Sequence, residues 1–162
     1  MLAVEECRSW QEWRELRLEA LADTPIGFGD TLADALARPD EEWAERWVTH
    51  SSGPRYLAYD GDLLVGMAGG FVTDDGRRVL FGVYVRPAAR GHGVLEALVE
   101  RVATWAAPHD LQLDVHVDNA PARAAYVRLG FVEDGRTTPG GGIDGRDLVG
   151  MTLPLQVGGR SG

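Results

Sequence analysis

Residues 79–105 have the sequence VLFGVYVRPAARGHGVLEALVERVATW. The apolar beginning predicts a buried strand that ends at Val85, and the last part predicts a helix. A basic loop that carries two glycines, Arg90–Gly93, joins them. A strand, a short loop and a helix N-terminus in this order place backbone N–H groups and the positive end of a helix dipole around one anion. Because Arg86 and Arg90 flank the loop, we interpret it as a cradle for a pyrophosphate group.

Two better-known phosphate-binding patterns do not fit this loop. A dinucleotide-binding G-x-G-x-x-G fingerprint would need a glycine at position 96, where the chain has Glu96. No Gly-Lys-Ser/Thr sequence follows, so the loop is not a P-loop either. The structural alternative is a tight strand-to-helix turn whose glycines only tolerate unusual backbone angles.

The segment 111–131 again predicts a strand followed by a helix. Apolar and polar residues alternate over 111–117, which is the period of a strand. Asp118 or Asn119 can cap the helix that follows, and Gly130 can end it. A second strand–helix unit this close to the first favours the functional interpretation of the loop.

Together the two units resemble the GNAT superfamily of acetyl-CoA-dependent N-acetyltransferases, over about residues 57–131. The resemblance implies a single-domain α/β fold of GNAT type: a mixed, mostly antiparallel sheet with helices on both faces. The fourth and fifth strands would splay apart to admit the cofactor. Leu95 stands where the family usually has glycine or alanine. The matching residues are Arg90, Gly93 and Leu95 in the loop, and Asn119, Tyr126, Gly130 and Phe131 in the second unit.

The resemblance also implies a reaction, the transfer of an acetyl group from acetyl-CoA to a primary amine by direct attack. Tyr126 would be the general acid for the departing CoA thiolate, and Asn119 would hydrogen-bond the pantetheine arm. Taken alone, Asn119 as a helix cap and Tyr126 as a packing residue are the simpler interpretations. The implied acetyl-CoA contacts are Val83, Tyr84, Val85, Arg90, Gly91, His92, Gly93, Val94, Leu95, Asn119 and Tyr126.

The acceptor amine must lose a proton before it attacks, which calls for a general base. Many family members keep a Glu or His early in the fourth strand, but here the corresponding residues are Val79 and Phe81. His116, on the polar face of the fifth strand, is the preferred substitute, and Asp114 shares that face. Two alternatives stay open: both side chains simply meet solvent or a polar partner, or ordered water takes the proton without a dedicated base.

Two irregular segments are expected to contact the acceptor, as they do in the family. The first is Asp23–Thr31, in which Phe28 and Asp30 are the candidate substrate-binding residues. The second is the glycine-rich Gly135–Gly145, which is either a lid or a disordered surface loop. The expected acceptor is a small-molecule or peptide amine, and its identity stays open.

Length and composition limit the other classes of protein. At 162 residues the chain is long enough for one domain, expected at 1–155 with a frayed tail at 156–162. It has no apolar run long enough for a transmembrane helix and no secretory signal pattern, so we expect a cytoplasmic protein that does not bind membranes. A single cysteine, Cys7, and no Cys/His cluster predict that there is no metal site.

The net charge of −9 argues against nucleic acid as a partner and suits a cationic acceptor. A homodimer agrees with the resemblance but cannot be derived from these residues. Two rival functions remain. One is an acyl-CoA sensor or interaction module that keeps the fold without turnover, and the other is an unrelated nucleotide-binding domain.

The remaining elements are predicted from local periodicity and turn residues. The predicted helices are Trp10–Leu21, Leu32–Ala37 and Glu41–Thr49. The predicted strands are Leu2–Glu6, a hairpin of Arg55–Tyr59 and Leu63–Val72, and a last pair at Phe131–Glu133 and Arg146–Leu153.

Overall fold

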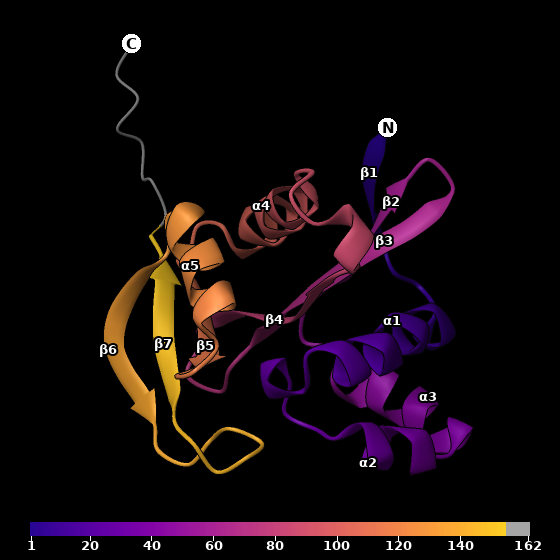
Figure 1. Ribbon diagram of the computed structural model, residues 1–162, viewed down its shortest axis with the longest axis horizontal. Coiled ribbons are helices and arrows are strands. Elements are labelled where there is room, and N and C mark those ends of the chain that lie inside the picture. Colours follow the sequence, from indigo (N-terminus) through magenta and orange to yellow (C-terminus); the bar gives the residue numbers. More distant parts are fainter. Residues whose placement is uncertain (155–162) are drawn as a thin grey trace.

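The computed structural model describes residues 1–154, which form one seven-stranded sheet with helices on both faces (Figure 1). The strand order is β1-β2-β3-β4-β5-β7-β6, and β4–β5 is the parallel pair in an otherwise antiparallel sheet. The expected α/β architecture is confirmed. The predicted tail, 156–162, lies outside the described residues. The strands are Leu2–Glu6 (β1), Arg55–Asp60 (β2), Leu63–Val72 (β3), Arg78–Val85 (β4), Leu111–His116 (β5), Val132–Thr138 (β6) and Leu148–Leu153 (β7).

The buried side chains form two cores, one on each face of the sheet, and each core is covered by helices. In Figure 1, α1, α2 and α3 gather on one face of the sheet and α4 covers the other. Leu98 and Val102 of α4 belong to one core, whereas Trp13 and Leu16 of α1 belong to the other. Among residues 1–154, no helix has the length and apolar character needed to span a membrane. The helices are Trp10–Asp23 (α1), Leu32–Ala37 (α2), Asp40–Thr49 (α3), Val94–Ala106 (α4) and Ala120–Arg128 (α5), with short 3-10 turns at Pro25–Gly27 and Pro87–Ala89.

Strands β4 and β5 separate soon after they begin to pair. Their register comprises two residue pairs, Arg78 with Leu111 and Val79 with Gln112. Beyond this point β4 continues along β3, and β5 continues along β7. The facing edges of β4 and β5 therefore keep backbone groups that no neighbouring strand uses, and this confirms the expected splay.

Strand β4 has a bulge in the part that borders this opening. Met67 pairs with Tyr84 and Gly69 with Phe81, so Gly82 and Val83 on β4 face the single residue between them on β3. Gly82 has a φ of 62°, which strains a residue with a side chain. A Cβ there would also lie 2.9 Å from the Trp13 ring. Glycine thus permits both the bulge and the close approach of α1.

Glycines in β3 bring α4 close to the sheet. A Cβ on Gly66 would lie 3.0 Å from Val94, and one on Gly70 would lie 2.4 Å from the Trp105 ring. The first turn of α4, which follows the cradle loop, is therefore fixed directly over β3 and β4.

Most predicted elements are confirmed within a few residues, but β6 is longer than expected. It continues to Thr138, with a register shift against β7 between Glu133 and Thr137. The segment is mostly exposed and has no apolar alternation, so the sequence carries no strand signal there. Backbone pairing with β7 forms the strand instead.

Candidate active site

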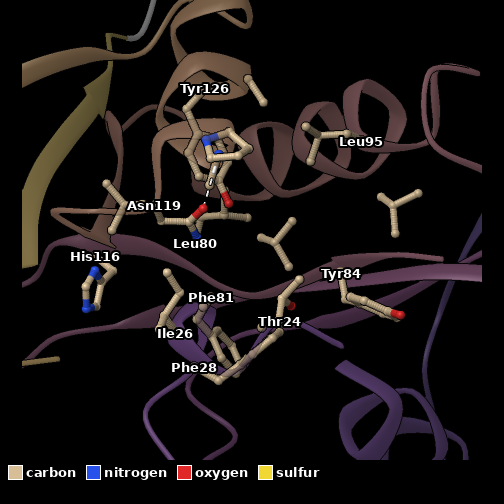
Figure 2. Close-up of a pocket in the computed structure, with 18 of the residues that line it drawn as sticks. Thr24, Ile26, Phe28, Leu80, Phe81, Tyr84, Leu95, His116, Asn119 and Tyr126 are labelled. Atoms are coloured by element: carbon tan, nitrogen blue, oxygen red, sulfur yellow. Dashed lines mark hydrogen bonds between the residues drawn. The ribbon is translucent and has the colours of Figure 1, made fainter. Parts of the chain in front are cut away.

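A cavity of about 820 Å³ opens where β4 and β5 diverge. Its walls come from the α1–α2 connection, from β4 and the loop before α4, from the β5–α5 unit, and from the loop between β6 and β7. Figure 2 shows Asn119 and Tyr126 on one side of the opening and Phe28 and Phe81 on the other. A concave site of this size matches the usual dimensions of small-ligand pockets.

Gly91 and Gly93 shape the loop before α4. Their φ angles of 78° and 84° are in the left-handed region. A Cβ at either position would meet nothing within 4 Å, so the backbone angle, and not a lack of space, requires glycine. Gly93 is also the N-cap of α4 and has no side chain that could cap the helix. No residue of 1–154 accepts a hydrogen bond from the N–H groups of 91–95, which leaves them available to an anion.

Arg86 and Arg90 hold the loop in place through acidic residues of α1. Arg86 donates to the Glu19 carboxylate at 2.8 Å, and this hydrogen bond raises the pKa of Arg86 above its ordinary value. Arg90 lines the cavity but donates to Asp23 at 2.6 Å and to the Val85 carbonyl at 3.0 Å. Both flanking arginines thus have acidic partners on α1, and the expected contact of Arg90 with acetyl-CoA stays a prediction.

The β4 wall presents Val83 and Val85 to the cavity. The Tyr84 side chain between them packs into the core on the α1 face. Its hydroxyl donates to Asp23 at 3.3 Å, and burial together with the charges of Glu19 and Asp23 raises the pKa of Tyr84 to about 12. The Tyr84 side chain therefore holds β4 on the α1 face of the sheet, while the backbone of β4 lies at the edge of the cavity.

Tyr126 and Asn119 reach the cavity from α5 (Figure 2). The Tyr126 ring packs edge to face against Phe131, with centroids 5.5 Å apart. No hydrogen bond joins its hydroxyl to any residue of 1–154, and burial raises the pKa of this phenol well above that of an ordinary tyrosine. Asn119 is the N-cap of α5, because its Oδ1 accepts from the Ala122 N–H at 3.3 Å. Asn119 thus caps α5 and lines the cavity at the same time.

His116 lies in the cavity wall but is almost fully buried, with 3% of its surface exposed. Its Nδ1 accepts a hydrogen bond from the Asp118 N–H at 3.1 Å. The proton of the neutral ring is therefore assigned to Nε2, which donates to the two Asp144 oxygens at 2.9 and 3.0 Å. Neither ring nitrogen keeps an open lone pair for an amine proton. The hydrogen bond also lowers the pKa of Asp144.

The loop between β6 and β7 is attached to the end of β5. Asp144 holds His116, and Arg146 pairs with Asp118 at 2.5 Å. Gly141 and Gly142 thereby line the cavity. Two side-chain contacts thus join the segment expected as a lid or a disordered loop to β5 and the residues after it, and its role as a lid stays a prediction.

The α1–α2 connection forms the opposite end of the cavity. Phe28 is buried, with 7% exposed, although the turn-rich sequence around it suggests exposure. Asp30 does not line the cavity, since its two oxygens accept from Arg17 at 2.7 Å and Arg38 at 3.3 Å. Arg17 takes its place in the wall. Asp30, the residue expected to contact the acceptor, therefore lies behind the cavity wall as the partner of Arg17.

Arg17 is absent from the contacts expected from sequence, although a signal for it exists. It stands four residues after Trp13 and three before Ala20, both of which are buried. This helical spacing directs Arg17 toward the sheet. A charged residue on a buried helix face is unusual enough to mark a site.

The structure brings most of the residues expected from sequence to one cavity. Those that line it are Phe28, Val83, Tyr84, Val85, Arg90, Gly91, Val94, Leu95, His116, Asn119 and Tyr126. His92, Gly93 and Asp30 are not in its wall.

Comparison with protein-family models gives a match over residues 10–131, to the family described as the acetyltransferase (GNAT) family. The matched region contains α1, the cradle loop and α5. Comparison with curated protein sequences gives no match.

Solved acetyltransferase structures superpose on nearly the whole chain. A ribosomal-protein-alanine N-acetyltransferase from Brucella melitensis is 25% identical, with a TM-score of 0.68 over 94% of this chain and 99% of that one. A putative acetyltransferase from Salmonella typhimurium, solved with its cofactor acetyl-CoA, is 20% identical, with a TM-score of 0.71 over 98% and 96%. A variant of the spermidine N-acetyltransferase from Vibrio cholerae is 17% identical, with a TM-score of 0.68 over 94% and 92%. The chain therefore shares the overall fold of these acetyltransferases.

Proposed function

The chain belongs to the acetyltransferase (GNAT) family and is an acyltransferase, and from this premise we propose that it moves an acetyl group from acetyl-CoA to a primary amine by direct attack. One observation carries the proposal: a single cavity is lined by Gly91, Val94 and Leu95 at the start of α4 and also by Tyr126. Similar structures are named as N-acetyltransferases of a ribosomal-protein alanine and of spermidine, which supports an amine acceptor.

The residues around the cavity fit acetyl-CoA in two places. The N–H groups of 91–95, at the positive end of α4, suit its pyrophosphate. The unpaired edge of β4 at Val83 and Val85 suits its pantetheine arm, which can pair with the strand as an added strand would. Asn119 adds a side-chain amide on the α5 side. Bound there, acetyl-CoA supplies an acetyl thioester that a neutral amine can attack, with the CoA thiolate as leaving group.

Tyr126 is the proposed general acid for that thiolate. A proton donor must remain protonated at the working pH, and burial favours the neutral phenol here. The hydroxyl has no competing acceptor within residues 1–154, so its proton is available to the cavity. Phe131 fixes the ring through its edge-to-face contact.

The amine proton is proposed to leave through ordered water, and not directly to His116. Both nitrogens of His116 are already hydrogen-bonded, to the Asp118 N–H and to Asp144. His116 would instead position the wall at Gly141 and Gly142 through Asp144. The proposal therefore keeps the alternative in which ordered water takes the proton and no side chain acts as a dedicated base.

The proposal is tested by following thiol release from acetyl-CoA across a panel of amines, with product identified by mass spectrometry. The panel holds polyamines, free amino acids, peptides with a free N-terminus or lysine, and aminoglycosides. We expect amine-dependent release that equals the acetylated product. Cys7 is 5% exposed and should contribute no reactive thiol to the assay. Binding of acetyl-CoA by calorimetry without thiol release on any amine would reject amine acetylation and favour an acyl-CoA-binding module.

A further inference from the structure

The acceptor side of the cavity contains a guanidinium that the proposed reaction does not use, that of Arg17 in α1. Its side chain is largely buried, with 17% exposed. Nη1 lies 4.0 Å from the position that a Cβ on Gly82 would occupy, so the group reaches the β4 bulge. It also lies over Phe28, with Cζ 4.7 Å from the ring centroid.

The carboxylate that pairs with Arg17 is shared with a second arginine. Asp30 accepts hydrogen bonds from both Arg17 and Arg38. Glu42 lies 3.7 Å from Arg38 but also pairs with Arg46 at 2.9 Å. Asp30 is therefore shared between two guanidinium groups, those of Arg17 and Arg38, and of these two only Arg17 lines the cavity.

Most N–H donors of Arg17 are open. A guanidinium carries five N–H groups, and within residues 1–154 Arg17 makes a single hydrogen bond, to Asp30. The Phe28 and Phe81 side chains beside it offer no strong acceptor. A partly desolvated guanidinium with open donors is well suited to a carboxylate, because two parallel N–H···O bonds can form.

We infer, as a refinement that rests on the proposed function, that the acceptor is a free amino acid with an apolar side chain and that Arg17 binds its carboxylate. The thioester would lie beside Val83, where β4 bulges toward the opening, and the attacking amine must reach it there. Arg17 stands at Gly82, the adjacent residue. A carboxylate held by Arg17 must therefore be bonded close to the reacting nitrogen, as the α-carboxylate is.

The rest of this end of the cavity fits an apolar side chain. Ile26, Phe28 and Phe81 lie together across from Tyr126 (Figure 2), and Phe71 contacts Phe81 with ring centroids 5.5 Å apart. A polyamine would bring additional positive charge to Arg17, and a peptide N-terminus has a neutral amide in place of the carboxylate. Either acceptor would leave desolvated donors unpaired, which disfavours binding.

The test compares amines that differ only in the carboxylate. L-phenylalanine is paired with 2-phenylethylamine and L-leucine with 3-methylbutylamine, and kcat/KM is measured for each with saturating acetyl-CoA. We expect the amino acid to exceed its decarboxylated partner by at least about tenfold, as for loss of a hydrogen-bonded charge. The same pairs are titrated calorimetrically in the presence of CoA.

Variants separate carboxylate binding from other roles of Arg17. Arg17→Gln should lower kcat/KM for the amino acids at least about tenfold and change that for the amines less than about threefold. Arg17→Lys should give an intermediate preference, because it keeps the charge but not the planar pair of donors. Arg38→Gln is the matched control: it removes the other guanidinium on Asp30 and should keep the preference, since Arg38 does not line the cavity.

Each outcome decides one proposal. Acetylation of both members of each pair at equal rates would overturn the carboxylate site and leave amine acetylation intact. An equal loss on both members in Arg17→Gln would also overturn it and assign Arg17 to the thioester or to folding, with acetyl-CoA affinity and the unfolding midpoint distinguishing these. If no amine releases thiol, amine acetylation fails. In that case, calorimetric preference for L-phenylalanine would still support the carboxylate site, and no preference would overturn it.

Discussion

At Tyr126, burial prepares a side chain for proton donation. The hydroxyl lines the cavity, and no residue of 1–154 neutralises or accepts from it. Desolvation disfavours the charged phenolate, so the pKa rises and the neutral phenol persists. Because almost no phenolate is present at neutral pH, Tyr126 can donate a proton but is not available as a base.

Replacing Tyr126 with phenylalanine should lower kcat on the order of 100-fold, within the usual range for loss of a general acid. Phenylalanine keeps the ring contact with Phe131, so the acetyl-CoA dissociation constant should change less than about twofold. Steady-state kinetics and calorimetry measure the two quantities. Unchanged kcat in Tyr126→Phe would remove the acid assignment.

The raised pKa of Tyr126 also predicts the alkaline side of the pH profile. The acid form is the active one, so activity is lost only as pH rises through the pKa in the folded protein, which lies above the ordinary value of 10.0. The rate should rise with the fraction of neutral amine and then stay level past pH 10. A decline in kcat centred below pH 10, absent from Tyr126→Phe, would contradict the raised pKa.

At the scale of elements, the loop before α4 depends on backbone conformation. Gly91 and Gly93 hold left-handed backbone angles at the start of the helix, and no residue of 1–154 accepts a hydrogen bond from their N–H groups. Asp23 and Glu19 of α1 fix the flanking arginines, so one helix supports the entry to the next.

We expect Gly93→Ala to weaken acetyl-CoA binding about tenfold or more, because alanine disfavours the φ of 84° and the loop must rearrange. Gly61→Ala is the matched control. Gly61 has a φ of 60° and open space at its Cβ, but it lies in the β2–β3 turn away from the cavity. Both variants should lose about 1 kcal/mol of unfolding free energy in urea titrations. Equal acetyl-CoA affinity in the two would show that the loop conformation is not needed for binding.

At the scale of the whole molecule, the cavity lies between two parts of the sheet that share few contacts. Strands β1 to β4 and strands β5 to β7 meet at the short β4–β5 pairing. A ligand in the cavity would contact both parts, because β4 and α5 both line it. Its binding would therefore stabilise the molecule as a unit.

Coenzyme A at 100 times its dissociation constant should add about 2.7 kcal/mol to the free energy of unfolding. For a domain of this size, that corresponds to a rise in Tm of roughly 5–10 °C. Thermal unfolding followed by circular dichroism checks the shift, with ATP as the comparison ligand. An equal shift with ATP would show that the site does not distinguish coenzyme A from other nucleotides.

The sequence by itself determined the elements and the order in which they occur. The apolar strand ending at Val85, the glycine loop and the helix after it depend on local periodicity and backbone preferences, so residues 79–105 were sufficient to locate the cradle. The spacing of Asn119, Tyr126 and Gly130 is also local, and it placed α5 within a residue or two of its actual ends.

Only the tertiary structure decided which charged groups reach the cavity. Arg17 and Asp30 are separated by a helix end and a turn, and in the structure they pair so that Arg17, and not Asp30, lines the cavity. Likewise, His116 takes its hydrogen bonds from Asp118 and Asp144, and the second of these lies in a distant loop. A side chain's role in proton transfer or charge recognition depends on its partners in space, and periodicity along the chain does not determine those.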